Sequence, residues 1–310
     1  MVSNSKIFEW NIKSELQNIE MTVGLPALNS EKILWLPLES LKNQIDINFK
    51  WELICFEDYG SSLDLIKTYI GLLPNCVRIV HYNINPILDG RQTGKFKGKY
   101  ILIDKWINIS KIASKNSKIF VMHDADDFSP TKRLYIHYEH FKNKNCYLST
   151  QKKGVFINLK NKKKMLYNGD KKDGIKKQNN IFKNNFYVFN HLNKALLTKD
   201  MKKIKPANKN RGIDNYIRTN VIKLNKLNCY KNKHIFIDEE IDKNNWKFGF
   251  FTDGYNNISI SRSDFYDKVN SKSTSLGPWM KLKGATRKSF SYKKLSKYIP
   301  EYILKRLGLC

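Results

Sequence analysis

Three aspartates within four positions are the residues of this sequence whose types and spacing point most directly to chemistry. Asp124, Asp126 and Asp127 follow the apolar run 119–122. Carboxylates this close repel one another unless a cation or hydrogen bonds offset their charge. Hard divalent ions prefer oxygen ligands and commonly bridge a carboxylate to the phosphates of a substrate. The cluster therefore predicts a Mg²⁺ or Mn²⁺ site, with capping of the next helix by Asp127 as the structural alternative.

The pattern around the cluster predicts the elements that position it. Short apolar runs alternate with helix-like stretches, which is typical of an α/β protein with a mostly parallel central sheet flanked by helices. Strands are expected at 21–25, 51–56, 77–82 and 118–122, and helices at 31–44, 63–72 and 100–113. A break is expected at Pro37, and Ser129 followed by Pro130 predicts the start of another helix. The acidic cluster thus falls at the carboxyl end of a strand, where open α/β sheets bind ligands.

Three motifs in this order resemble those of family 2 glycosyltransferases. The run 121–130, which contains Asp124-Ala125-Asp126-Asp127, resembles the strand and DxD turn of that family. The run 23–29 is similar to its first strand and Pro-x-x-Asn turn, and the run 55–62 is similar to its base-binding turn. The resemblance covers roughly residues 21–145. It implies a GT-A-type fold and a nucleotide-diphospho-sugar donor, most often a UDP-sugar.

The resemblance also implies which residues bind the donor. Pro26 and Asn29 belong to the first donor loop, and Asp58 hydrogen-bonds the base, which is usually uracil. The family places two aspartates before a small residue, whereas this chain has Glu57-Asp58-Tyr59. Glu57 is therefore the alternative base-binding carboxylate. Asp58 as an ordinary turn residue is the structural alternative.

The remaining roles concern the metal and the acceptor. By resemblance, Asp124 contacts the ribose and joins Asp126 in holding Mn²⁺ or Mg²⁺. An inverting transferase also needs a general base for the acceptor hydroxyl. Asp214 is the candidate, because the run 211–216 resembles the later acidic turn of the family, although Ile213 stands where Glu is common. Capping of the helix that begins near Asn215 is the alternative role for Asp214.

The net charge of +28 bears on the acceptor. So strong a positive field attracts polyanions, and a general bias toward Lys and Asn is the alternative explanation of the excess. We expect a glycan or lipid-linked saccharide acceptor, with the basic amphipathic segment 286–310 resting on an anionic membrane. The alternatives are a glycosyltransferase that acts on a modified base in DNA, and a non-catalytic, basic nucleic-acid-binding protein on a transferase scaffold.

The chain is expected to divide into an N-terminal extension (1–20), a donor half (21–150), an acceptor half (151–285) and the basic tail (286–310). No apolar run is long enough to span a membrane, so we expect a cytoplasmic protein that is at most peripheral on a membrane. The five cysteines lack metal-binding spacing. His123 is expected to be satisfied by backbone at the strand end, and His137 and His140 to be surface or interface residues.

Overall fold

The computed structural model describes most of the first half of the chain and separate elements of the second half. The described ranges are 6–28, 33–58, 60–84, 102–125, 127–143, 147–151, 153–158, 164–168, 194–205, 213–225, 235–238, 247–251, 288–289 and 292–309.

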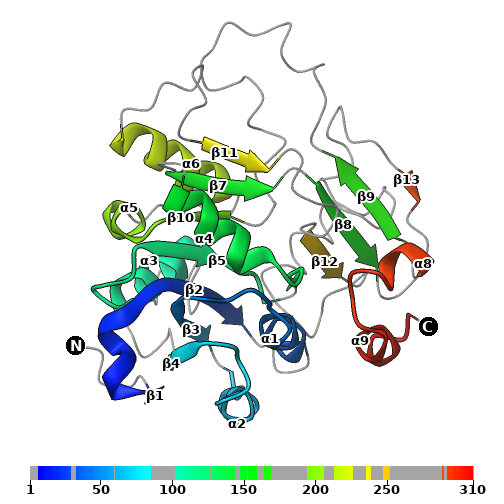
Figure 1. The fold of residues 1–310 in the computed structure, drawn as a ribbon, viewed down its shortest axis with the longest axis horizontal. Helices are drawn as coiled ribbons and strands as arrows, with labels where there is room; N and C mark the ends of the chain where they lie inside the picture. The colour runs from blue at the N-terminus through cyan, green and yellow to red at the C-terminus, as the bar shows by residue number, and fades with distance from the viewer. Residues whose placement is uncertain are drawn as a thin grey trace, which may run out of the picture.

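An eight-stranded sheet forms the centre of the molecule, in the order β1-β4-β3-β2-β5-β10-β7-β11 (Figure 1). Four successive strands, β4, β3, β2 and β5, are parallel to one another, whereas β1 runs antiparallel to β4 and β10 runs antiparallel to β5 and β7. The strands are β1 (Lys6–Asn11), β2 (Ile19–Leu28), β3 (Lys50–Asp58), β4 (Cys76–Ile84), β5 (Ile119–Met122), β7 (Leu148–Gln151), β10 (Lys194–Leu197) and β11 (Ile235–Asp238). The predicted mostly parallel α/β sheet is thus confirmed, and strands from both sides of residue 150 share it.

Helices cover both faces of this sheet because the central strands are apolar on both sides. Successive side chains of β3 alternate between faces, so Leu53 and Cys55 join one core cluster while Ile54 and Phe56 join the other. The first cluster contains α1 (Trp35–Lys42), α2 (Leu63–Lys67) and α4 (Arg133–Asn143). The second contains α3 (Leu102–Ile112), α5 (Thr198–Lys203) and α6 (Ile213–Leu224).

A second sheet of five strands lies beside the carboxyl ends of the central strands (Figure 1). Its order is β13-β9-β8-β12-β6, with β6 (Asp127–Phe128), β8 (Lys153–Asn158), β9 (Lys164–Asn168), β12 (Lys247–Phe251) and β13 (Lys288–Ser289). Strands β8 and β9 pair with each other in antiparallel orientation. Because β5 ends at Met122 and β6 begins at Asp127, the acidic cluster is the link between the two sheets.

Two expected helix details are wrong, each for a local reason. The helix containing Pro37 is not broken, because it begins at Trp35 and the proline lies in its first turn, where a missing N–H costs nothing. The helix after the acidic cluster begins at Arg133 rather than directly after Ser129. The hydroxyl of Ser129 instead contacts the His123 ring and accepts a hydrogen bond from Arg133.

The C-terminal segment folds against the body of the molecule. Leu295, Ile303 and Leu304, in and around α8 (Tyr292–Leu295) and α9 (Glu301–Arg306), are fully buried in a third cluster with residues of α1 and β6. The Tyr302 hydroxyl donates to Glu39 of α1 at 2.6 Å, and the Arg306 guanidinium lies 3.9 Å from the Trp35 ring centre. The apolar side of the expected membrane-binding segment is therefore occupied by the protein itself. Among the described residues, no helix has the length and apolarity needed to cross a bilayer.

Candidate functional site

The strand order places a topological switch point between β2 and β5. The chain adds β3 and then β4 on one side of β2, and returns to add β5 on the other side. In open α/β sheets, ligands bind in the crevice outside the carboxyl ends of the strands at such a point. The acidic turn follows β5, and Pro26 lies near the carboxyl end of β2, so two predicted motifs meet here.

Pro26 helps to separate β2 from β5 at this point. The carbonyl of Gly24 accepts a hydrogen bond from the His123 backbone N–H at 3.0 Å. Every second residue of β2, counted from Gly24, therefore points its backbone N–H and C=O groups toward β5. Pro26 is the next residue of that set, and it has no N–H to continue the ladder. Contrary to expectation, β2 does not end there, because it continues to Leu28 beside β3. The two strands therefore diverge where the acidic turn begins.

The acidic turn is fixed by its own backbone and by His123. The Asp124 carbonyl accepts from the Asp127 N–H at 3.3 Å and lies 3.0 Å from Nδ1 of His123. His123 is fully buried, and its Nε2 lies 2.8 Å from the hydroxyl of Ser129. A hydrogen on Nδ1 satisfies the carbonyl and leaves Nε2 to accept from Ser129. The expected backbone contact of His123 is present at Nδ1 and supports the Asp124 carbonyl, but Nε2 lies against the hydroxyls of Ser129 and Ser40 instead of backbone.

A buried positive charge lies behind the same turn. Arg133 is fully buried and donates to the Ser129 hydroxyl at 2.8 Å and to the Met122 carbonyl. Burial lowers the pKa of Arg133 to about 10, while Asp127 and Asp124 act against that shift. The guanidinium thus stays protonated at neutral pH and offsets part of the carboxylate repulsion. Sequence reasoning missed Arg133, which looks like any other basic residue of a very basic chain.

The two carboxylates at the end of β3 face opposite sides of the sheet. Glu57 lies on the α2 side, where it accepts from the Ser62 hydroxyl at 2.7 Å and lies 2.8 Å from Nε2 of His81. The side chain folds beneath the turn, so that a Cβ on Gly60 would lie 1.7 Å from the Glu57 carboxyl carbon. Because the Glu57 carboxylate is engaged by Ser62 and His81 beneath the turn at Gly60, Asp58 is the stronger base-binding candidate.

Asp58 lies on the α3 side and pairs with a lysine. The Asp58 Oδ1 is 3.2 Å from the Lys105 ammonium, which also donates to the Ala27 carbonyl at 2.6 Å. Asp58 is fully buried and Lys105 is 4% exposed, so the pair is largely removed from water. Lys105 was not predicted as a site residue. Its signal in the sequence is a lysine on the apolar side of a helix, between Ile103 and Trp106.

The structure gives less detail for the other predicted site residues. Asn29 and Asp126 lie outside the described residues, and Asp124 is partly exposed. Asp214 is the second residue of α6, which begins at Ile213, so it lies in the first helical turn and not at the expected cap position. Within the described part of the chain, no group of three or more His, Cys, Asp or Glu residues is arranged to hold a metal ion. Asp124 offers the oxygen ligand that a hard cation prefers.

The expectation for His137 and His140 is wrong. Both side chains are almost fully buried between α4 and β7, and both Nδ1 atoms lie within 2.8 Å of the Ser149 hydroxyl. Burial lowers the pKa of His137 well below its ordinary value, and the nearby Arg133 adds to the shift. The ring is therefore neutral at physiological pH. Spacing alone gave no sign that this side of the helix faces the sheet.

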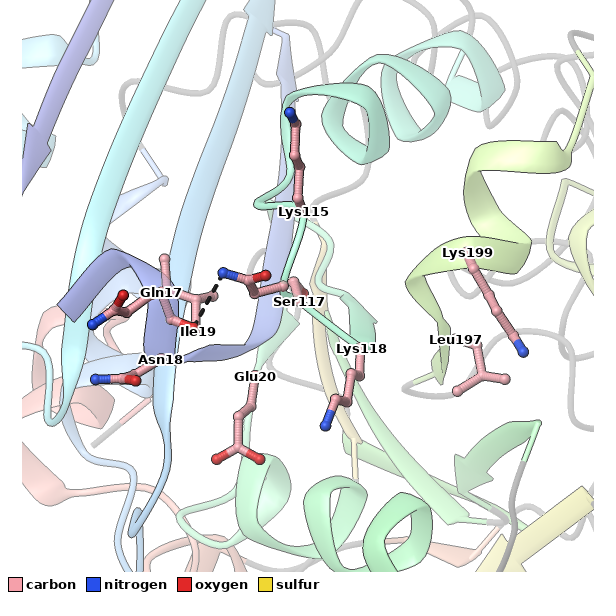
Figure 2. Close-up of a pocket in the computed structure, with 10 residues that line it drawn as sticks. Gln17, Asn18, Ile19, Glu20, Lys115, Ser117, Lys118, Leu197 and Lys199 are labelled. Atoms are coloured by element: carbon pink, nitrogen blue, oxygen red, sulfur yellow. Dashed lines mark hydrogen bonds between the residues drawn. The ribbon is translucent and has the colours of Figure 1, made fainter.

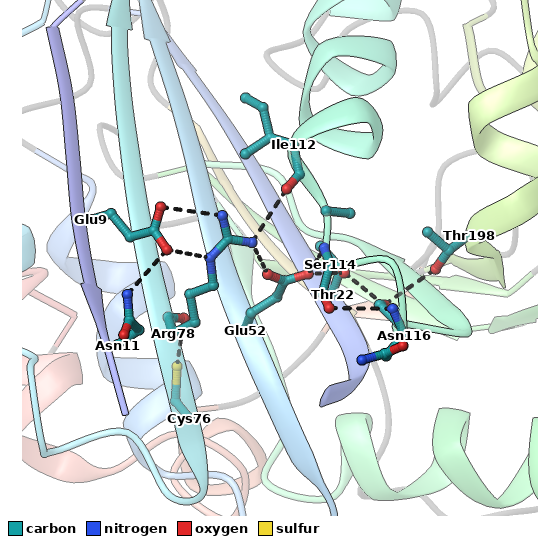
Figure 3. A network of polar contacts seen from close by, with 12 residues as sticks. Glu9, Asn11, Thr22, Glu52, Cys76, Arg78, Ile112, Ser114, Asn116 and Thr198 are labelled. Atoms are coloured by element: carbon teal, nitrogen blue, oxygen red, sulfur yellow. Dashed lines mark hydrogen bonds and ion pairs between the residues drawn. The ribbon is translucent and has the colours of Figure 1, made fainter. Parts of the chain in front are cut away.

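The amino-terminal edge of the central sheet carries a different set of polar groups. Glu52, at the start of β3, receives hydrogen bonds from Thr22, Arg78 and the Ser114 backbone N–H (Figure 3). A nearby pocket of about 860 Å³ is lined by Glu20 and three lysines (Figure 2). Its size is in the range of small-ligand sites, but it lies at the wrong ends of the strands for the switch-point rule. The lysines are Lys115, Lys118 and Lys199.

Comparison with solved structures agrees with the predicted fold. S. aureus TarS is similar with a TM-score of 0.50 and 15% identity, over 80% of this chain and 38% of that chain. S. aureus TarS 1-349 in complex with UDP-GlcNAc is similar with a TM-score of 0.50 and 16% identity, over 80% of this chain and 64% of that chain. This chain thus spans less than two thirds of the length of either structure. Neither a protein-family model nor a curated protein matches it. The fold is the GT-A type found in nucleotide-sugar transferases.

Proposed function

We propose that the protein is a metal-dependent glycosyltransferase that moves a sugar from a UDP-sugar to an acceptor hydroxyl. The observation that carries the proposal is the acidic turn at the carboxyl end of β5, beside the switch point with β2. The His123 ring contacts the backbone carbonyl of Asp124, and the buried Arg133 donates to Ser129 just after the turn, so the turn has a defined support. A structure of similar fold is described in complex with UDP-GlcNAc, which supports a uridine donor.

The donor is bound at three points in this proposal. Asp58 hydrogen-bonds the uracil, and Pro26 and Asn29 shape the loop beside it. Asp124 contacts the ribose, and Asp124 and Asp126 hold Mn²⁺ or Mg²⁺. When bound, the cation neutralises the charge that develops on the departing diphosphate. The charge behind the turn suits this arrangement, because Arg133 limits the repulsion that the carboxylates exert on each other before a cation binds.

The transfer step requires a base on the acceptor side. Asp214 removes the proton from the acceptor hydroxyl while that oxygen bonds to the anomeric carbon and the bond to the diphosphate breaks. The sugar is transferred with inversion, and UDP leaves. Asp214 is the second residue of α6, which begins at Ile213.

The charge of the chain supports a polyanionic acceptor. A glycan or lipid-linked saccharide with phosphate groups would be drawn to it, as would DNA that carries a modified base. Insertion of the C-terminal segment into a membrane has no support in the packing, because its apolar residues are buried against α1 and β6. Contact with a membrane through basic side chains, including the exposed Lys297 and Lys305, is still compatible with that packing.

Asp126→Ala tests the donor site. In the wild type, UDP and UDP-sugars should raise the melting temperature only when Mn²⁺ or Mg²⁺ is present, because they bind the folded state. Asp126→Ala should lose this shift and the metal-dependent turnover of the donor while it keeps the wild-type melting temperature without ligand. Asp64→Ala, a change of an exposed carboxylate in α2, is the matched control. A wild type that responds to no nucleotide would instead favour a basic binding protein on a transferase scaffold.

A further inference from the structure

The contact of Lys105 with Asp58 joins the carboxyl ends of two strands. Lys105 projects from α3, and its ammonium lies 2.6 Å from the Ala27 carbonyl of β2 and 3.2 Å from Asp58 Oδ1 of β3. A lysine is rarely buried unless it is paired. The structure therefore gives this ammonium two oxygen partners, both at the end of the sheet where the donor is proposed to bind.

The helix that carries Lys105 is held firmly. Trp106 and Ile109 of α3 pack onto Gly24 of β2, where an added Cβ would lie 2.9 Å from the Trp106 ring and 3.0 Å from Ile109. Only a residue without a side chain lets α3 approach β2 this closely. The position of the Lys105 ammonium is therefore set by the packing of the helix on the sheet.

Among the described residues, Glu57 and Cys55 of β3 are titratable groups near the pair. Both side chains lie on the other face of the sheet, where Glu57 contacts His81 and Ser62 and Cys55 is buried. Burial lowers the pKa of Lys105, and the Asp58 carboxylate opposes that shift most strongly. Lys105 makes a direct ion pair with Asp58.

We infer that Lys105 is a positioning residue that keeps Asp58 ionised and thereby determines which base the donor site accepts. The inference rests on the proposed function, in which Asp58 meets the base. An ionised carboxylate only accepts hydrogen bonds, whereas a protonated one also donates. Uracil presents an N–H at ring position 3, and cytosine presents an unprotonated nitrogen at the same position. An ionised Asp58 therefore matches uracil and rejects cytosine.

Lys105→Met tests this inference, because methionine has a similar length and no charge. Loss of the ammonium removes a positive charge that favours the ionised carboxylate, and burial then shifts Asp58 toward its neutral, protonated form. Affinity for UDP should fall about tenfold or more at pH about 6, while affinity for CDP stays equal or rises. Raising the pH should restore the preference for UDP, because it ionises Asp58 again. Lys111→Met, a change of an exposed lysine on the same helix, should leave both affinities unchanged.

Titration calorimetry with UDP and CDP in the presence of Mn²⁺, on the full chain, gives the answer. An equal loss for both nucleotides, or no loss for either, in a folded Lys105→Met variant would overturn the inference while the proposed function stands. A wild type that binds neither nucleotide would overturn both. If Lys105→Met does not fold, Lys105→Gln keeps a hydrogen-bond donor without the charge. The same fall in the UDP preference is expected for it, and an unchanged preference would overturn the inference.

Discussion

The parallel strands of the central sheet have buried charged side chains at both their amino-terminal and their carboxyl-terminal ends, called here the amino-terminal and carboxyl edges. These side chains have different roles at the two ends. At the amino-terminal edge, Glu52 is surrounded by donors from Thr22, Arg78 and the Ser114 backbone, and Arg78 also pairs with Glu9 (Figure 3). At the carboxyl edge, the carboxylates are held on turns, as at Asp124, or at a strand end, as at Asp58. The difference teaches that burial of charge does not by itself mark a site. The carboxyl edge differs because its charged residues, such as Asp58 and Asp124, lie at or next to the topological switch point between β2 and β5.

The largest effect on stability is expected at the amino-terminal edge. Glu52→Gln removes a fully buried charge, and of the described acidic residues the partly exposed Glu9 then remains as the ion-pair partner of Arg78. We expect the free energy of unfolding to fall by about 3 kcal/mol, because one partner of a buried ion pair is removed and Glu9 compensates the Arg78 charge only in part. Urea denaturation measures this change. Glu301→Gln, which removes an exposed pair with Lys305, should cost less than about 0.5 kcal/mol.

The affinity of the same variant, Glu52→Gln, for UDP tests whether the two ends of the strands have separate roles. UDP affinity of folded Glu52→Gln should equal that of the wild type, because the changed network lies at the opposite ends of the strands. A loss of UDP affinity as large as that expected for Asp126→Ala would contradict the division of roles between the two edges.

A smaller loss of stability, coupled to binding, is expected at the carboxyl edge. Gly60→Ala places a Cβ where the Glu57 carboxylate lies, and Glu57 must leave Ser62 and His81 to make room. We expect a loss of about 2 kcal/mol in the free energy of unfolding, as for other overpacked sites. UDP affinity should also fall, because Asp58 is the neighbour of Glu57. The control is Gly71→Ala, at a position with φ of 76° and open space around it, which affects stability without affecting UDP.

The smallest effect is a pH dependence at the amino-terminal edge. Hydrogen bonds from Arg78 hold the pKa of Glu9 below its ordinary value, despite partial burial. A carboxylate with a lowered folded-state pKa stabilises the protein above its unfolded-state pKa, and that contribution is lost as the pH falls through the folded-state value. Glu9→Gln should therefore be less stable than the wild type at neutral pH, and the difference should shrink as the pH falls below the ordinary pKa of a glutamate. A difference that persists undiminished in acid would remove Glu9 as the cause.

The elements that carry the donor motifs could be predicted because short-range sequence patterns mark them. Apolar runs located β2, β3, β4 and β5, and helical spacing located α2 and α3. Pro37 and Ser129 were misjudged because their roles depend on where a helix starts and on partners distant in the chain, such as His123.

The buried basic residues could not be predicted for a related reason. Among 56 lysines and arginines, nothing local marks Arg133 as one that tertiary packing removes from water, and the only local sign for Lys105 is its position between Ile103 and Trp106. The same holds for His137 and His140, whose burial depends on the packing of α4 on β7. The central sheet also gains β1, β10 and β11 through pairings that join distant parts of the chain.

Hydrogen exchange with and without UDP and Mn²⁺ tests most directly whether the carboxyl edge is the donor site. Exchange should be slower in 24–28, 56–62 and 119–125 when both are present, and unchanged in 17–20, 115–118, 197 and 199, which line the pocket at the other end of the strands. Protection confined to that lysine-lined pocket (Figure 2) would contradict the account and would place the nucleotide at the amino-terminal edge.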